Sequence, residues 1–251
     1  NLPVELMEAS GIAAQTDSTF WMMNDSGNPP ELFLVDYKGN IIGKKYISNA
    51  ANSDWEELTS DVNGNLYIGD FGDNNQNRTD CKILKVEKSA LNSKKDTISV
   101  SKQSFRYSTD RSYDAEAMIH MHNSIYIFTK NREPRFDGTT ILFKLSPNDS
   151  IAQFQSKIKL YSDIRELSWV TSASLSPDKS ALILLSSDKM FVFSNFEKDK
   201  FFEGDMQIIS LETLTQKEAV DFISNSEIII TDEDNSGIGG KLYYVDLKEV
   251  N

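Results

Sequence analysis

A short acidic phrase recurs along the chain, and its carboxylates are the residues best suited to chemistry. The copies contain Glu8, Glu56, Glu116 and Glu218, and each copy opens a short apolar stretch. The intervals are roughly 50 residues or twice that, a period typical of proteins built from repeated small sheets. A degenerate fifth copy follows Trp169, where hydroxyl side chains replace the carboxylate. Carboxylates from separate repeats act together only where the fold brings the repeats to one point.

Oxygen ligands gathered around one axis predict a site for a hard cation. Like charges raise one another's pKa, so such a ring requires protons or a cation to neutralise it. Carboxylates and hydroxyls without His or Cys favour Ca²⁺, which takes about six to eight oxygens, over zinc or copper. We expect five residues to hold Ca²⁺, with Thr171 as the alternative to Ser172: Ser10, Glu56, Glu116, Ser172 and Glu218. The alternative is that these side chains bind neighbouring backbone N–H groups and water.

Polar loops predict a second set of residues around this ring, since loops at the mouth of a repeat fold often carry function. The expected ligand contacts are Asp70, Asp73, Asn74, Arg78, Lys130, Arg132 and Asp232. The basic members, together with a metal, could hold an anionic group such as phosphate or carboxylate. The alternative is that they are solvated side chains that offset the local negative charge. Residues 232–237 resemble the start of a calcium loop, but Tyr243 stands where an EF-hand requires Glu.

The elements that must position these residues are short strands. Segments enriched in Val, Ile, Phe and Tyr alternate with turns of Gly, Asn, Asp and Ser. This pattern predicts an all-β protein, a five-bladed β-propeller with four-stranded antiparallel blades. We expect one domain, 1–251, with blades near 8–48, 54–108, 114–162, 169–212 and 217–247.

Two details of the ring follow from the strand pattern. Residues 97–107 are expected to form the outer strand of the second blade. The last repeat lacks an outer strand, whereas residues 1–7 form a strand-like segment that belongs to no repeat. We expect this N-terminal strand to join the last blade beside 241–245, which would close the ring and cover two sheet edges.

The composition excludes several classes of partner and site. With 26 basic and 38 acidic residues, the net charge of −12 argues against a nucleic acid polymer or an anionic membrane surface. Cys81 is the one cysteine, so no intrachain disulfide or thiolate cluster forms, and His120 and His122 are too few for a His-rich zinc site. The sequence contains no apolar run of about 18 residues, so no transmembrane segment is expected. We expect a monomer.

Phrases in the middle third resemble those of a family of uncharacterised secreted bacterial propellers. Residues 54–58 read Asp-Trp-Glu-Glu-Leu and residues 69–74 read Gly-Asp-Phe-Gly-Asp-Asn, similar to the D-W-E-D and G-D-x-G-D-N phrases of that family. Residues 114–117 read Asp-Ala-Glu-Ala and match its third phrase. The resemblance implies a secreted, periplasmic or cell-surface propeller with no established activity.

The order Ser, Glu, Glu, Ser, Glu around the expected ring is similar in pattern to the calcium-activated nucleotidases, or apyrases. That family is five-bladed and holds a central calcium on such ligands, so the resemblance also implies Ca²⁺ at the axis. Between the ring positions the chain shares little with the family, and its nucleotide-holding basic residues have no clear counterparts here.

Three functions remain open from the sequence. The first is a calcium-binding propeller that binds a small-molecule or protein ligand at the tunnel mouth without catalysis. The second is a calcium-dependent hydrolase of phosphoesters or phosphoanhydrides, with Lys130 and Arg132 on the anion. A glycosidase would need two carboxylates at catalytic separation, and no phrase of the sequence favours it.

Overall fold

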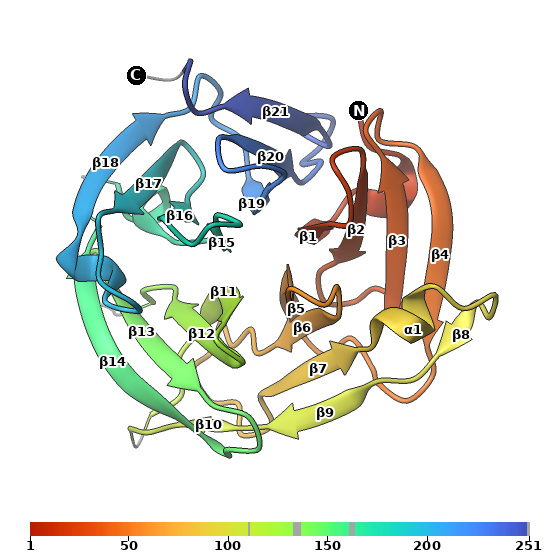
Figure 1. Ribbon diagram of the computed structural model, residues 1–251, viewed down its shortest axis with the longest axis horizontal. Coiled ribbons are helices and arrows are strands. Elements are labelled where there is room, and N and C mark those ends of the chain that lie inside the picture. The colour runs from red at the N-terminus through yellow and green to blue at the C-terminus, as the bar shows by residue number, and fades with distance from the viewer. Residues whose placement is uncertain (110, 133–136, 161–163, 250–251) are drawn as a thin grey trace.

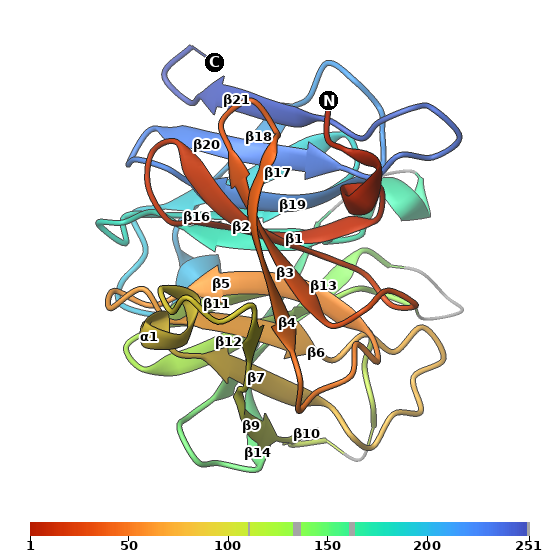
Figure 2. The ribbon, with the colours of Figure 1, turned by 90° about the vertical axis from the view of Figure 1, so that its right-hand side faces the viewer.

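A computed structural model describes residues 1–109, 111–132, 137–160 and 164–249 as five small sheets around a central axis (Figure 1). The predicted all-β, five-bladed propeller is confirmed. Seen from the side, the turns that join the first and second strands lie at one end of the ring (Figure 2). The loops that follow the second strands lie at the other end, which we call the tunnel mouth.

Each blade is an antiparallel meander that runs outward from the axis. The first consists of β1 (Ala9–Ala14), β2 (Thr19–Asn24), β3 (Glu31–Asp36) and β4 (Ile41–Ile47). The second consists of β5 (Trp55–Ser60), β6 (Leu66–Asp70), β7 (Lys82–Val86) and β9 (Ser101–Ser104). The third consists of β11 (Ala115–Met121), β12 (Ser124–Thr129), β13 (Thr139–Leu145) and β14 (Ile151–Lys159).

The last two blades differ in their number of strands. The fourth consists of β15 (Ser172–Leu175), β16 (Ala181–Leu185), β17 (Lys189–Ser194) and β18 (Asp205–Ser210). The fifth consists of β19 (Lys217–Phe222), β20 (Glu227–Asp232) and β21 (Leu242–Asp246). The helical turns are η1 (Val4–Leu6), α1 (Lys88–Leu91), η2 (Arg165–Ser168) and η3 (Phe201–Glu203). None of these helices is long and apolar enough to cross a membrane.

The prediction of one outer strand at 97–107 is wrong, because this segment serves three blades. β8 (Thr97–Ile98) pairs in parallel with β4, β9 pairs with β7, and β10 (Arg106–Tyr107) pairs in parallel with β14. The breaks between these short strands fall at Val100 and Phe105, which are buried in the apolar clusters on either side of the second blade. We call residues 97–107 the strap (Figure 1).

Ring closure by an N-terminal strand is also wrong. Residues 4–6 form the 3₁₀-helix η1, and the fifth sheet contains three strands within the described residues. The segment binds the last blade through single backbone bonds, from Leu2 N to Gly240 O at 2.7 Å and from Asp234 N to Met7 O at 2.9 Å. Leu6 is fully buried and packs in one cluster with Ile12 of the first blade and Ile229 of the fifth. Apolar packing therefore closes the ring where the sequence suggested strand pairing.

The apolar core is divided among the seams between blades. Five clusters of buried side chains each join one pair of neighbouring blades, including the pair formed by the fifth and the first. Trp55 is fully buried in the seam between the first two blades, and Tyr113 packs against the seam between the second and third. Both aromatic residues are thus wedges between blades.

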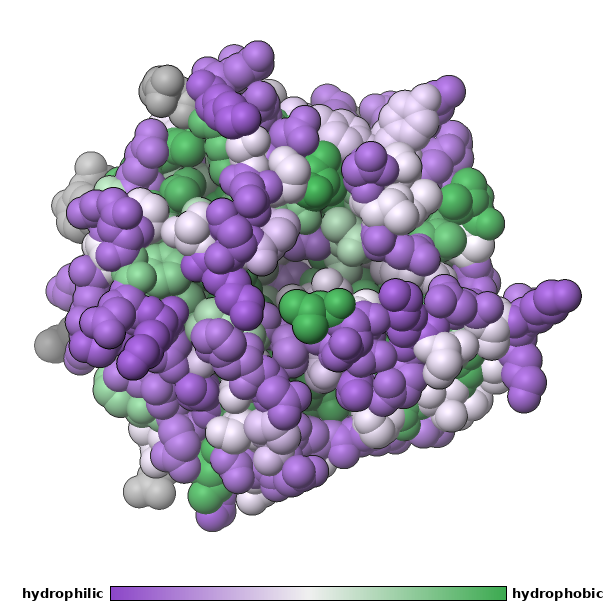
Figure 3. Space-filling model, in the orientation of Figure 1, coloured by the Kyte–Doolittle hydropathy of each residue, from purple (hydrophilic) through white to green (hydrophobic). Residues whose placement is uncertain are grey.

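The end of the tunnel opposite its mouth is mostly hydrophilic and hollowed near its centre (Figure 3). A cavity of about 600 Å³ lies there among the hairpin turns of all five blades.

Truncation of the buried anchor of η1 tests closure by packing. We expect Leu6→Ala to lower the free energy of unfolding by roughly 2–5 kcal/mol, because it leaves a cavity in the seam between the fifth and first blades. Urea denaturation measures the change. Val4→Ala in the same helix is the matched control, since Val4 is 73% exposed, and we expect a change within about 0.5 kcal/mol. Equal effects of the two substitutions would contradict the anchoring role of Leu6.

Candidate metal centre at the tunnel mouth

Four innermost strands begin with a β-bulge, an extra residue that drops out of the ladder. The bulged residues are Ser10, Glu56, Glu116 and Glu218, one in each of four blades. A bulge redirects its side chain and is common beside functional sites. The same local distortion therefore presents one polar side chain per blade at the mouth end of the tunnel.

The bulges bring carboxylates from neighbouring blades together. One side-chain oxygen from each of Glu56, Asp114 and Glu116 lies within 4.8 Å of the others, and all three residues are buried. A second group consists of Asp25, Asp54 and Glu56, which satisfy the same distance. Glu56 belongs to both groups and so joins them into one acidic cluster.

Glu56 and Glu116 are the members of this cluster expected from the sequence, whereas its three aspartates were not among the expected ligands. Asp54 and Asp114 each stand two residues before a bulged glutamate, at 54–56 and 114–116. This repeated Asp-x-Glu spacing was a signal that could have found them. Asp25 follows β2 in a loop, and nothing in its spacing relates it to the other acids.

Glu218 lies near the cluster but in neither of its groups. Burial and, to a lesser extent, the charge of Glu218 raise the pKa of Glu116, and Lys130 lowers the pKa of both glutamates. Burial raises the pKa of Glu218 to about 7, and burial also raises the pKa of Glu233 on the adjacent loop to about 7.

The structure places Ser172 one level deeper than the ring expected from the sequence. Ser10 Oγ donates to Trp55 O at 3.0 Å, and Thr171 Oγ1 makes the equivalent contact with Lys217 O at 2.7 Å. In both cases the acceptor precedes the bulged residue of a neighbouring blade. Thr171 therefore takes the position equivalent to Ser10, because the fourth blade pairs in regular register and carries no bulge at Ser172.

Two cations face the acidic cluster. Lys130 Nζ donates to Glu116 Oε1, and Arg132 Nε donates to Asp114 Oδ2 at 2.6 Å. Both lie over the ring of Trp169, with Lys130 Nζ 4.9 Å and the Arg132 guanidinium carbon 4.4 Å from its centroid. Trp169 thus holds the two basic side chains against the carboxylates.

The charges of the cluster are not balanced by these two cations. Burial raises the pKa of Glu116 to about 8 against the opposing effect of Lys130, and burial together with the Glu116 charge raises the pKa of Glu56 well above its usual value. Burial raises the pKa of Asp25 to about 6. In addition, Glu116 Oε2 is buried without a hydrogen-bond partner among the described residues. Such a cluster takes up protons or a further cation.

Most of the other residues predicted to contact a ligand hold loops in place. Arg78 donates to Asp70 Oδ1 at 2.8 Å, to Asp80 Oδ1 at 2.9 Å and to Gly72 O at 2.9 Å. The carboxylate of Asp73 accepts the backbone N–H groups of the two residues 77 and 78.

The remaining two predicted contacts differ from one another. Asp232 accepts Lys241 N at 2.8 Å and the Tyr243 hydroxyl at 2.6 Å, so it joins the two ends of the loop between β20 and β21. Asn74 lies at the mouth, where its side-chain oxygen accepts a hydrogen bond from Arg132.

Deeper in the tunnel, buried carboxylates join blades to one another. Glu57 of the second blade is fully buried and accepts Ser172 Oγ at 2.7 Å and Ala173 N at 2.9 Å from the fourth blade. Because the third blade separates these two, the bonds cross the tunnel. Asp221 of the fifth blade accepts Ala14 N at 2.7 Å and Ser174 Oγ at 2.6 Å. Neither carboxylate was among the site residues expected from the sequence.

Comparison with known proteins places the chain by its fold alone. No protein-family model and no curated protein matches the sequence. Among solved structures, a gluconolactonase from Xanthomonas campestris aligns with a TM-score of 0.53 and 13% identity, covering 96% of this chain and 76% of that chain. The shape is common, since 645 chains of solved structures match it, and a shared fold does not select an activity.

Removal of the Glu57 carboxylate tests its role as a bond across the tunnel. We expect Glu57→Ala to lower the free energy of unfolding by roughly 2–4 kcal/mol, because Ala173 N–H and the Ser172 hydroxyl lose their buried acceptor. Urea denaturation measures this change. Glu203→Ala is the control, because that side chain is 68% exposed and its pair with Lys200 contributes little. A loss no larger than in the control would refute the role of Glu57.

The pH dependence of stability tests the burial of Asp221. Burial raises its pKa from 3.8 to about 6 in the folded state, so its contribution to stability is full below pH 4 and is lost as the pH rises through 6. Asp221→Asn removes this titration. We therefore expect the stability of the variant relative to the parent to increase by roughly 2 kcal/mol between pH 4 and pH 7. Parallel stability profiles for the two proteins, measured by urea denaturation, would contradict this assignment.

Proposed function

We propose that the protein binds a divalent cation, Ca²⁺, in the acidic cluster and uses it to hold an anionic ligand at the tunnel mouth. One observation carries the proposal: the carboxylates of Glu56, Asp114 and Glu116 are buried within 4.8 Å of one another. Burial of several carboxylates in one place is strongly unfavourable unless a positive charge joins them.

The donor set fits a calcium ion. All side chains of the two groups offer carboxylate oxygens, and neither group contains His or Cys. Carboxylates and water suit Ca²⁺, whose coordination is larger and more flexible than that of Mg²⁺. Glu116 Oε2 is a buried acceptor without a partner among the described residues, so it supplies a ligand atom at no loss of an existing bond.

The cations at the mouth support an anionic ligand. In the structure Lys130 and Arg132 pair with Glu116 and Asp114. A bound metal would neutralise those carboxylates and leave the two basic side chains available to a further negative group. A phosphate or carboxylate ligand could then bridge the metal and the two side chains. The phrases at 54–58 and 69–74 support a secreted, periplasmic or cell-surface location for this activity.

A calcium-dependent hydrolase is the second candidate function. A metal in the cluster would polarise a phosphoryl or carbonyl oxygen of a bound substrate. Glu218 and Glu233, whose pKa values burial raises to about 7, favour this candidate, because groups that titrate near neutral pH can exchange protons with a substrate. The gluconolactonase with a similar fold is itself a hydrolase, and this adds lactones to the phosphoesters and phosphoanhydrides as substrate classes to test.

Calcium titration of metal-free protein tests the first proposal. We expect isothermal titration calorimetry to detect Ca²⁺ binding, and Glu56→Gln or Glu116→Gln to weaken it at least about tenfold, because each substitution removes one charged ligand. Glu203→Gln, which neutralises an exposed glutamate, should leave the affinity unchanged. The absence of binding at millimolar Ca²⁺ would overturn the proposal.

A substitution that strengthens Ca²⁺ binding provides a second test of the calcium site. Lys130 occupies Glu116 Oε1, so its ammonium group competes with the metal for that oxygen. We expect Lys130→Met to strengthen Ca²⁺ binding at least about tenfold, since it removes a buried positive charge from the site. Lys144→Met is the control, because Lys144 pairs with Asp199 instead. Weaker binding in Lys130→Met than in the parent would contradict the competition.

Hydrolysis assays separate the two functions. We expect a hydrolase to release phosphate from nucleoside di- or triphosphates, or to open lactones, with Ca²⁺ and not with chelator. Glu116→Gln should lower that turnover at least about a hundredfold, because the metal loses a ligand. If a protein that binds Ca²⁺ has no turnover on any of these substrates, the non-catalytic binding function stands and the hydrolase is refuted.

A further inference from the structure

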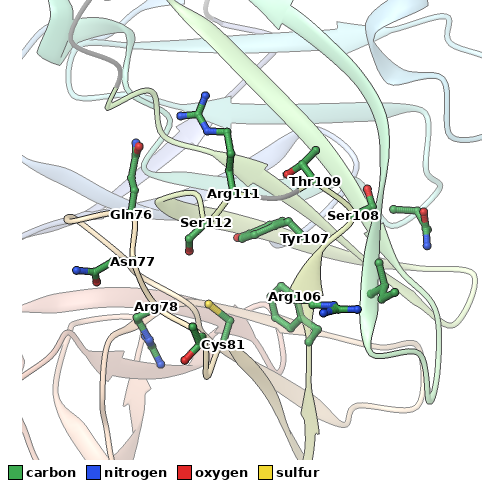
Figure 4. Close-up of a pocket in the computed structure, with 14 residues that line it drawn as sticks. Gln76, Asn77, Arg78, Cys81, Arg106, Tyr107, Ser108, Thr109, Arg111 and Ser112 are labelled. Atoms are coloured by element: carbon green, nitrogen blue, oxygen red, sulfur yellow. The ribbon is translucent and has the colours of Figure 1, made fainter.

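A pocket of about 730 Å³ lies in the outer part of the seam between the second and third blades, away from the tunnel axis (Figure 4). Its walls come from the loop that follows β6, from β10 and the described residues that follow it up to Ser112, and from the start of β14. The volume falls within the usual range for small-molecule sites. The pocket is a product of the strap, because β10 crosses from the second blade to pair with the third.

The charged side chains among the described lining residues of this pocket are all cationic. Arg106 and Arg111 line it, together with side chains that bear hydroxyl and amide groups, and no acidic residue is among its described lining residues. This is unusual in a chain with 38 acidic and 26 basic residues. Arg78 also lines the pocket, but its bonds to Asp70 and Asp80 hold it in place. The lining therefore favours an acceptor-rich, negatively charged ligand.

A buried hydroxyl supplies independent support for a ligand. Tyr107 is 4% exposed, and its hydroxyl has no hydrogen-bond partner in the part of the chain that the structure describes. Figure 4 shows this hydroxyl directed toward the side of the pocket on which Ser112 lies. Thr109 Oγ1, also in the lining, is likewise buried without a partner there. Burial of an unsatisfied hydroxyl is unfavourable, and an acceptor atom of a ligand would relieve it.

The pocket also has an apolar wall. Phe105 and Ile151 line it, and Phe105 packs edge-on against Tyr107 with ring centroids 5.6 Å apart. A ligand that fits both walls has a charged acceptor group and a compact apolar body. Lys130 and Arg132 line a separate, smaller pocket of about 240 Å³, which shares Gln76 and Arg111 with the larger one.

We propose that the pocket between the second and third blades is a binding site for a small organic anion, a carboxylate or a phosphate ester. Arg106 attracts the negative group, the Tyr107 hydroxyl donates a hydrogen bond to it, and Phe105 and Ile151 contact the apolar body. The site does not include the acidic cluster, so its occupation does not require Ca²⁺.

Calorimetry with phenyl phosphate and with benzoate tests the proposal in buffer that contains a chelator. We expect at least one of these probes to bind, and the comparison shows whether phosphate or carboxylate is preferred. Benzyl alcohol has the same apolar body without the charge, and we expect it to bind at least tenfold more weakly. Binding that appears only with Ca²⁺ would belong to the tunnel mouth and would overturn this proposal without affecting the calcium site.

Two variants assign the binding to this pocket. Tyr107→Phe removes a hydroxyl that has no partner in the described residues, so it should fold normally and weaken the better probe about five- to tenfold. Arg106→Gln should weaken it at least fivefold. Lys102→Gln on β9 is the matched control, since it removes one positive charge from the same strap outside the pocket and should leave the affinity unchanged. The proposal fails if neither probe binds at millimolar concentration, or if all three variants bind like the parent.

Discussion

The structure depends on apolar packing at five seams, each of which joins two neighbouring blades. No blade of this size buries both of its faces alone, so every sheet is stable only between two others. The seam between the fifth and first blades is held in the same way as the rest, with Leu6 inserted among side chains of both blades. Hydrophobic packing at the seams does not fix the direction of individual side chains. The positions of the polar side chains in the tunnel therefore depend on hydrogen bonds and charge.

The role of a carboxylate in the tunnel depends on its depth. Deep carboxylates such as Glu57 and Asp221 accept several hydrogen bonds from backbone and hydroxyl groups of other blades, and they serve to connect the ring. At the mouth, Glu56 and Glu116 stand on bulges, where the ladder leaves them fewer protein donors. The same residue type is thus structural where donors surround it and available to a cation where they are missing.

The sequence predicted the repeat, the fold and the meeting of Glu56 with Glu116, because the period of about 50 residues places equivalent positions around one axis. It left Thr171 and Ser172 as alternatives for the fourth blade, since a single-residue difference in bulging is invisible in composition. The strap was missed for a similar reason: β-propensity marks 97–107 as extended but does not say which of three sheets accepts each pair of residues. The N-terminal segment was misread because Leu6 and Pro3 suit a buried turn as well as an edge strand.

Because of the strap, some blades depend on the strands of their neighbours and others do not. Its ends complete the edges of the first and third sheets, so the second repeat cannot be copied, deleted or exchanged as a self-contained module without leaving its neighbours incomplete. The fourth and fifth repeats carry no such strand exchange within the described residues. Gain or loss of a blade would accordingly disturb neighbouring sheets less at the fourth and fifth repeats. Recombination experiments that graft foreign repeats should begin there.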